Sequence, residues 1–308
     1  MSLEVDIGGA SWIGSRANQE DCYMAYNREE KLPHQGSDPR RISMGVLCDG
    51  MGGEGMGAQC ACRAVRKFAE AFAETGSFNT QWVRRLEMAL YAANAAIANF
   101  KRIQGTENTN SGCVLVAAVI GGERLHYISV GDAYIWWFRP NETYRGVEYH
   151  LQEQKQTNRL HLSYKKITVK NGVRQEEHIT EEEAAEIYRR PTPGITVRSN
   201  PVSALIGKEI NYIDDSEHHK FRERDGRNSE RWLRAGDIII LASDGVEKAS
   251  GPVFFESILR DFGSEEHSAA QTASEIIREV EGQSTGKSDN AACIVLKIKE
   301  SQQRNSSS

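Results

Sequence analysis

Short runs of apolar and β-branched residues recur along the chain and predict strands. The run ISMGVLC at Ile42–Cys48 is typical of a buried strand, and GCVLVAAVI, RLHYISV and AYIWWFR follow one another between residues 112 and 139. Gly121–Gly122 favours a hairpin turn between the first two of these. Further strands are expected at Glu4–Trp12, Asp237–Ala242 and Ala291–Ile298. Neighbouring strands joined by tight turns indicate antiparallel sheets rather than parallel strands with helical crossovers.

Apolar residues at helical spacing predict two long helices after the strand at Ile42–Cys48. The first runs from about Ala58 to Glu74 and the second from about Thr80 to Ile103. A third helix is expected at about Ser264–Glu281, where Gly282 ends it. Alternation of such helices with antiparallel strands predicts an α+β protein.

The hydrophobic pattern loosens between about residues 140 and 196, where the chain becomes polar and charged. Thr180 followed by Glu183 has the spacing of a helix capping box in this stretch. We interpret residues 140–196 as a polar, flap-like excursion from a single domain that spans residues 1–300. The last residues, 301–308, have low complexity and are expected to be a disordered tail.

Composition and charge argue against several classes of protein. Apolar residues make up 39% and charged residues 26% of the chain, as in globular proteins, and the net charge of −5 speaks against general nucleic-acid binding. No segment approaches the length of a membrane span, and the first residues lack the pattern of a signal peptide. The six cysteines form no CxxC pair, so we expect reduced, packed thiols in a cytoplasmic protein.

Aspartates stand at the ends of four predicted strands. Asp49, Asp132 and Asp244 follow strands, and Asp289 precedes one. In an antiparallel sheet these strand ends can share one edge, so the carboxylates could converge, together with Glu20 and Asp21. Converging carboxylates repel one another, and hard divalent cations relieve that repulsion. Ligation by oxygen alone suits Mg²⁺ or Mn²⁺, and two such ions could hold a bridging water and make it a nucleophile.

Plainer interpretations of the same residues stay open. Asp-Gly after a strand is also a common turn, and an arginine such as Arg16 is often a surface residue. Residues 50–55, GMGGEG, match the outline of a dinucleotide-binding loop. Asp49 directly before this loop would repel a pyrophosphate, and the predicted helix leads into another helix rather than a strand. Arg16, a few residues before Glu20 and Asp21, suits recognition of phosphate oxygens.

Six motifs in order resemble the protein phosphatase 2C family of metal-dependent phosphatases, in particular its bacterial branch. They cover most of the chain: SRANQED at Ser15–Asp21, VLCDGMGG at Val46–Gly53, SVGDAYIW around Asp132, VRSNPVSALIG at Val197–Gly207, AGDIIILASDGV at Ala235–Val246 and SDNAACIVL at Ser288–Leu296. The resemblance implies a four-layer α-β-β-α sandwich with two central antiparallel sheets flanked by helices.

The resemblance also implies roles for single residues. Asp49 would bridge two Mn²⁺ or Mg²⁺ ions, and Gly50 would offer its carbonyl. Glu20 would act through water with Asp21 beside it, and Arg16 would hold the substrate phosphate. Asp244 and Asp289 would complete the second metal's ligands, and Asp132 with Asp244 would suit a third, weaker metal.

Three departures from the family pattern concern substrate and proton transfer. Met51 stands where some members carry a histidine proposed as general acid, so water could protonate the leaving group. Ala133 replaces a usual serine, and the excursion at 140–196 is longer than the family's flap region.

The sequence therefore predicts direct hydrolysis of phosphoserine and phosphothreonine by metal-activated water, in a single catalytic domain. Phosphoprotein substrates, and a Ser/Thr kinase, are the expected partners. Two alternatives remain: a pseudophosphatase that binds phosphoproteins or a kinase, and a hydrolase of small phosphoesters.

Overall fold

The computed structural model describes the chain except for a few segments. The described residues are 3–30, 40–52, 55–75, 81–143, 146–154, 162–170, 173–180, 183, 186–187, 190, 195–201, 205, 207–208, 232–249, 252–284 and 286–301. The expected disordered tail, apart from Ser301, lies outside them.

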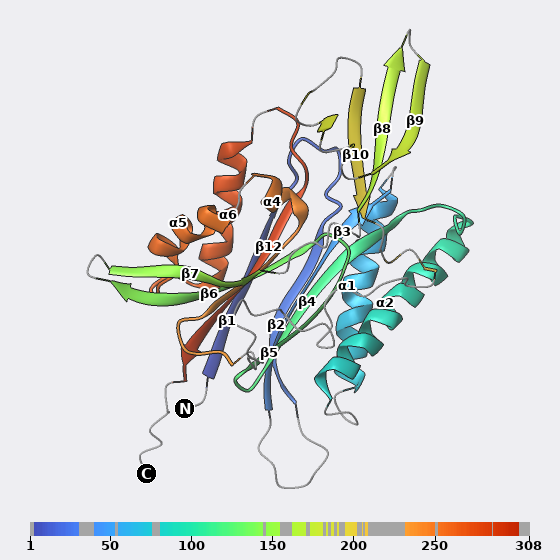
Figure 1. Cartoon of the computed structure of the whole chain (residues 1–308). Helices are drawn as coiled ribbons and strands as arrows, with labels where there is room; N and C mark the ends of the chain where they lie inside the picture. Colours follow the sequence, from blue (N-terminus) through green and yellow to red (C-terminus); the bar gives the residue numbers. More distant parts are fainter. Residues whose placement is uncertain are drawn as a thin grey trace, which may run out of the picture.

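Two antiparallel sheets form the centre of the molecule (Figure 1). The first contains, in spatial order, β1 (Leu3–Trp12), β12 (Ala291–Glu300), β11 (Ile238–Ala242), β6 (Tyr134–Thr143) and β7 (Gly146–Gln154). The second contains β2 (Cys22–Glu30), β3 (Arg40–Met51), β4 (Gly112–Gly121) and β5 (Arg124–Val130). The expected antiparallel pairing is confirmed, including the hairpin between β4 and β5.

Helices cover the outer face of each sheet. The pair α1 (Met56–Thr75) and α2 (Trp82–Gln104) lies on the second sheet. The helices α4 (Asp244–Ala249), α5 (Pro252–Phe262) and α6 (Ala269–Gln283) lie on the side of the first. The fold is thus the expected α+β sandwich with the layer order α-β-β-α.

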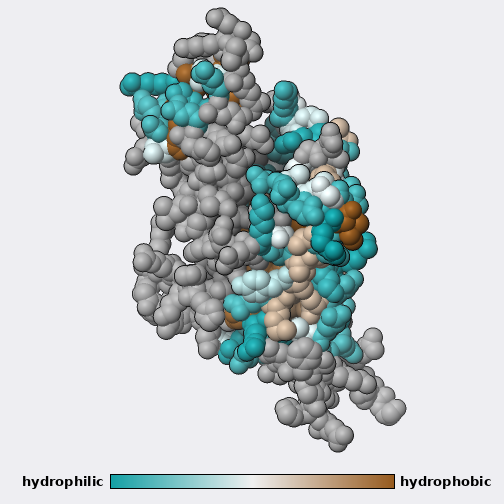
Figure 2. Space-filling view, turned by 90° about the vertical axis from the view of Figure 1, so that its right-hand side faces the viewer, coloured by the Kyte–Doolittle hydropathy of each residue, from teal (hydrophilic) through white to brown (hydrophobic). Residues whose placement is uncertain are grey.

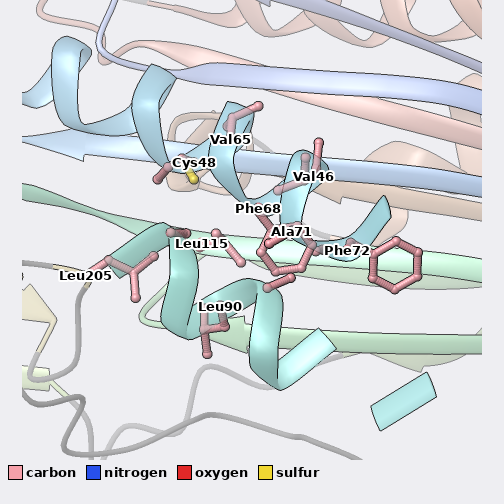
Figure 3. Close-up of a cluster of buried hydrophobic side chains, with 14 of the residues drawn as sticks. Val46, Cys48, Val65, Phe68, Ala71, Phe72, Leu90, Leu115 and Leu205 are labelled. Carbon is pink, nitrogen blue, oxygen red and sulfur yellow. The ribbon is translucent and has the colours of Figure 1, made fainter. Parts of the chain in front are cut away.

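Three apolar layers hold these four structural layers together. Phe68 and Phe72 of α1 and Leu90 of α2 pack on Val46 and Leu115 of the second sheet (Figure 3). A middle layer between the sheets and an outer layer under α5 and α6 complete the core. Both faces of each central strand are therefore buried, which explains why their sequences read as nearly continuous apolar runs.

Several elements differ from the sequence-based expectations. The strand β2 and the helices α4 and α5 were not predicted. The helix expected from Ser264 begins only at Ala269, because Ser268 caps it with a hydrogen bond from Gln271 N at 3.2 Å. The excursion also contains regular strands, since β6 and β7 belong to the first sheet.

The rest of the excursion forms a small sheet of its own. Its strands are β10 (Ile195–Pro201), β8 (Leu162–Lys170) and β9 (Val173–Ile179), in that spatial order. In Figure 1 it projects at the top of the molecule, beyond the ends of β2 and β3 from which Asp21 and Asp49 come. The capping box is confirmed, because Thr180 N donates to Glu183 Oε2 at 2.8 Å and Glu183 N donates to Thr180 Oγ1 at 3.2 Å.

The expectation that all cysteines are reduced was wrong for two of them. Cys22 of β2 and Cys62 of α1 form a disulfide, which tertiary contact creates without any local sequence motif. Cys48, Cys60, Cys113 and Cys293 are free and buried, as expected.

The outward surface beside α2 is mostly hydrophilic with a narrow apolar band (Figure 2). Met88, Tyr91 and Ile103 are the large exposed apolar side chains of α2. Among the described helices, none combines the length and apolar character needed to cross a bilayer.

Candidate active site

The acidic residues singled out in the sequence meet at one end of the two sheets. Asp49 lies near the end of β3, and Asp21 directly precedes β2. Burial raises the pKa of Asp49 well above its ordinary value, and four neighbouring carboxylates raise it further. They are Asp21, Asp244, Asp132 and Asp289. Residues far apart in the sequence thus form one negatively charged cluster.

By exposed fraction, Asp21 is the most buried carboxylate of this cluster. It is 6% exposed, and its Oδ2 accepts a hydrogen bond from Ser243 Oγ at 2.7 Å. Its Oδ1 is buried and accepts no hydrogen bond from a protein donor among the described residues, although a hydrogen bond with the Asp49 carboxyl lowers the pKa of Asp21. Burial, followed by the charges of Asp244 and Asp289, raises the pKa of Asp21 to about 7, although the Ser243 hydrogen bond opposes this rise.

Glu20 and Arg16 extend the cluster toward solvent. Arg16 Nη2 forms an ion pair with Asp289 Oδ1 at 2.7 Å, and the Arg16 side chain is 53% exposed. This hydrogen bond to Asp289 raises the pKa of Arg16. Burial raises the pKa of Glu20, and the nearby charge of Arg16 lowers it. The expected arginine therefore lies beside the carboxylates and forms an ion pair with one of them, Asp289.

The expected turn at Asp49–Gly50 is instead part of β3, which continues to Met51, and these two residues pack tightly against Glu20 and the first turn of α1. Gly50 N donates to the Glu20 carbonyl at 3.2 Å. A Cβ atom on Gly50 would lie 2.6 Å from that oxygen, and one on Gly57 would lie 2.8 Å from Glu20 Oε1. Only glycine allows this approach of three backbone segments. Because β3 has antiparallel neighbours on both sides, the segment that begins at Gly50 is not a dinucleotide-binding loop, which follows a parallel strand.

Two polar residues that the sequence analysis did not single out hold the carboxylates in place. Ser243 fixes Asp21 and also accepts a hydrogen bond from Ala292 N at 3.0 Å. Asn290 accepts one from Glu20 N at 2.9 Å and donates to the carbonyls of Ile13 and Asn18 at 2.7 and 3.0 Å. Their motifs, ASDG and SDN, were visible, but the partners lie more than 200 positions away in the chain.

The cluster fits divalent cations in the chemistry of its donors. A buried carboxylate oxygen without a partner and several mutually repelling carboxylates are stable together only if they are protonated or if cations neutralise them. Among the described residues, no three acidic, histidine or cysteine side chains already stand close enough to enclose a metal ion.

Comparison with known proteins agrees with this fold. The family model described as protein phosphatase 2C matches residues 34–284. A search of curated proteins gives no match. The structure of the Mycobacterium tuberculosis serine/threonine phosphatase PstP/Ppp is 22% identical and has a TM-score of 0.57, covering 97% of this chain and 100% of that one.

Two further solved structures show the same fold. The catalytic domain of PstP in complex with two manganese ions is 20% identical over 97% of this chain and 100% of that one, with a TM-score of 0.55. The serine/threonine phosphatase Stp1 from Staphylococcus aureus is 15% identical over 96% of each chain, with a TM-score of 0.57.

Proposed function

The chain belongs to the protein phosphatase 2C family and is thus by class a protein serine/threonine phosphatase, and we propose that it hydrolyses phosphoserine and phosphothreonine in proteins with divalent metal ions. The observation that carries this proposal is the cluster around Asp49, whose pKa four other carboxylates raise. A protein that only binds phosphoproteins has no need for such a costly arrangement.

We assign the ligands of two Mn²⁺ or Mg²⁺ ions to this cluster. Asp49, the Gly50 carbonyl and Glu20 would hold one ion, and Asp49, Asp244 and Asp289 would hold the other. Asp21 would support Glu20, and Asp132 with Asp244 would hold a third, weaker ion. The unpartnered Oδ1 of Asp21 supports this assignment, because a buried acceptor of this kind requires a proton or a cation nearby. When bound, the ions would lower the pKa of a coordinated water and so supply a nucleophile.

The remaining steps depend on residues of the chain. Arg16 would bind the phosphate oxygens with its guanidinium, whose exposed side chain can reach a substrate. To do so it would exchange its contact with Asp289 for one with the phosphate. Asn290 and Ser243 would keep Glu20 and Asp21 in position while the charge on phosphate develops. Because Met51 provides no general acid, solvent water would protonate the leaving group.

Partners and location follow from the same proposal. Phosphoproteins are the substrates, and a Ser/Thr kinase that phosphorylates them is the expected counterpart. We propose action in the cytoplasm, because four of the six cysteines are free thiols and only Cys22 and Cys62 form a disulfide. We also propose that residues 1–300 form one catalytic domain, in which the small sheet of β8, β9 and β10 is a flap beside the site.

Hydrolysis of a phosphothreonine peptide with Mn²⁺, with and without EDTA, tests the function. We expect activity that EDTA abolishes and that Asp49→Asn reduces at least about 100-fold, in line with the loss of a central charged group at an active site. Asp261→Asn, an exposed carboxylate on α5, is the matched control and should retain full activity. A generic aryl phosphate distinguishes a protein phosphatase from a hydrolase of small phosphoesters. Peptide binding without turnover would instead indicate a pseudophosphatase.

A further inference from the structure

A disulfide between Cys22 and Cys62 lies next to the proposed metal ligands Glu20 and Asp21. Cys22 is the first residue of β2 and follows Asp21 without a spacer, while Cys62 lies in the second turn of α1. The two Cα atoms are 5.3 Å apart. The bond therefore ties the strand that directly follows the Glu20–Asp21 pair to the helix that comes after Asp49 and Gly50.

The same helix contacts the site at its first turn. A Cβ on Gly57 would lie 2.8 Å from Glu20 Oε1 and 2.9 Å from the Gly50 carbonyl carbon. Glu20, in the loop before β2, is thus half-buried against the first turn of α1 and the end of β3. A change in the distance between β2 and α1 would therefore also move Glu20 relative to Asp49 and Gly50.

The disulfide also closes the chain segment that carries Asp49. It joins residues 40 positions apart, and the segment between them includes β2, β3 and the start of α1. A crosslink over such a segment restricts the arrangements available to it. Breaking the disulfide lets β2 and α1 move relative to each other next to the proposed metal ligands.

We propose that Cys22–Cys62 is a reversible thiol-exchange site whose oxidation state sets the affinity of the neighbouring carboxylates for divalent metal ions. This inference depends on the proposed function in one respect: it takes these carboxylates as metal ligands. Its reaction partner is a dithiol, or the corresponding cyclic disulfide in the reverse direction. The oxidised protein is the form with higher metal affinity, because the crosslink fixes β2, which directly follows Glu20 and Asp21, against α1, which contacts Glu20.

The exchange is balanced in atoms and electrons. One thiolate of the dithiol attacks the sulfur of Cys62, forms a mixed disulfide and releases the thiolate of Cys22. The second thiol of the same molecule then attacks the dithiol sulfur of the mixed disulfide and releases the thiolate of Cys62. The dithiol becomes a cyclic disulfide, and its two electrons and two protons pass to Cys22 and Cys62.

An external thiol can reach Cys22 and Cys62 more easily than the other four cysteines. Cys62 is exposed and Cys22 is half-buried, whereas the four free cysteines are buried. Arg66 is exposed one turn after Cys62 on the same side of α1, where its charge favours an approaching thiolate. Cys48 stands opposite Cys22 in the register of β2 and β3 but is fully buried.

The experiment measures disulfide state and metal binding separately. Alkylation of the full-length protein before and after dithiothreitol, followed by peptide mapping, should show two new thiols, at Cys22 and Cys62. Calorimetric titration with Mn²⁺ should show about 10-fold weaker binding after reduction, the size of change typical for residues that support metal ligands. Cys62→Ser and Cys22→Ser should bind as weakly as the reduced protein, with or without dithiothreitol. Cys293→Ala, a buried cysteine of the other sheet, should respond like the unmodified protein.

Two results would overturn the proposal: the absence of the Cys22–Cys62 disulfide in air-oxidised protein, or equal Mn²⁺ affinity in both oxidation states. Circular dichroism of the two serine variants shows whether they are folded. At saturating Mn²⁺ the reduced protein should still hydrolyse a phosphopeptide. Inactivity of every form, with Mn²⁺ affinity still dependent on the disulfide, would contradict the proposed function and leave the exchange site supported.

Discussion

The side chain of Asn290 accepts a hydrogen bond from the backbone N–H of Glu20 at 2.9 Å, across 270 positions of the sequence. Its amide nitrogen donates to the carbonyls of Ile13 and Asn18. One buried side chain thus connects the loop that carries Arg16 and Glu20 to the start of β12, next to Asp289. The proposed phosphate-binding and metal-binding groups are positioned by the same amide.

Replacing Asn290 should therefore weaken metal binding without removing any proposed ligand. Asn290→Asp keeps an acceptor for Glu20 N but places an oxygen against the two carbonyls, so the loop should shift. We expect 10- to 100-fold weaker Mn²⁺ binding by calorimetry, as for other residues that orient metal ligands. The free energy of unfolding should also fall, by about 1–3 kcal/mol, because the two carbonyls lose their donor and the buried side chain at 290 loses two hydrogen bonds.

The exposed loop residue Asn108 offers the matched control. Asn108→Asp should leave both Mn²⁺ affinity and stability unchanged. Asn290→Asp protein that is fully folded but binds Mn²⁺ normally would show that this amide has a structural role alone.

The carboxylates of the site could be found from the sequence because their positions follow local patterns. Asp49 and Asp289 stand beside strongly apolar strands, and the end of a buried strand is visible in the hydrophobic pattern alone. Antiparallel pairing then brings such ends together at one edge. The α+β class was predictable for the same reason, since burial on both faces gives β3 and β12 their apolar sequences.

Contacts between distant segments could not be found in this way. Nothing local distinguishes Asn290 or Ser243 from other polar residues beside a strand, because their partners are fixed only by the assembled sheets. The Cys22–Cys62 disulfide has the same origin: it depends on how α1 lies on β2. The strand β2 was missed because half-buried positions interrupt its apolar pattern.

Arg16 should contribute to turnover and little to stability. Its side chain is half-exposed, so its ion pair with Asp289 adds little to the free energy of unfolding. Arg16→Ala should lower kcat/KM for a phosphopeptide about 100-fold, as expected when a donor to the developing phosphate charge is lost. Mn²⁺ binding should not weaken, because removal of a cation frees Asp289.

The exposed arginine Arg278 on α6 provides a control, and Arg278→Ala should retain full turnover. If Arg16→Ala lost Mn²⁺ affinity in proportion to its activity, Arg16 would act by arranging the ligands and not by binding phosphate.

A buried ion pair far from the site should control stability. Arg85 donates to both oxygens of Glu30 at 2.8 Å and to the Phe72 carbonyl at 3.0 Å, and its side chain is 2% exposed. Arg85→Ala leaves a buried carboxylate without its main partner, which should cost about 3–5 kcal/mol in chemical denaturation. The double variant Arg85→Met with Glu30→Leu should recover most of this loss.

The neighbouring Arg84 is exposed, so Arg84→Ala should change the free energy of unfolding by less than about 0.5 kcal/mol. An equal loss in the single and double variants would mean that the side-chain volumes, and not the unpaired charge, determine the cost.

The metal-free protein should lose stability as the pH rises. The pKa of Asp21 is raised from 3.8 to about 7 by burial, so the folded state binds a proton that the unfolded state releases near pH 4. Between about pH 4 and 7 the unfolded state therefore binds fewer protons, and the free energy of unfolding should fall. The shift corresponds to a loss on the order of 4 kcal/mol, which the raised pKa of Asp49 increases.

Urea denaturation in EDTA at pH 5 and pH 7.5 measures this loss. In Asp21→Asn the slope against pH should be shallower, because the group that titrates is gone, whereas Asp261→Asn should retain it. Mn²⁺ should restore stability at pH 7.5 more than at pH 5, since cations bind the charged carboxylates. Stability that rises with pH in EDTA would show that the carboxylates are already neutralised by groups of the protein, and metal ions would not be needed to stabilise the cluster.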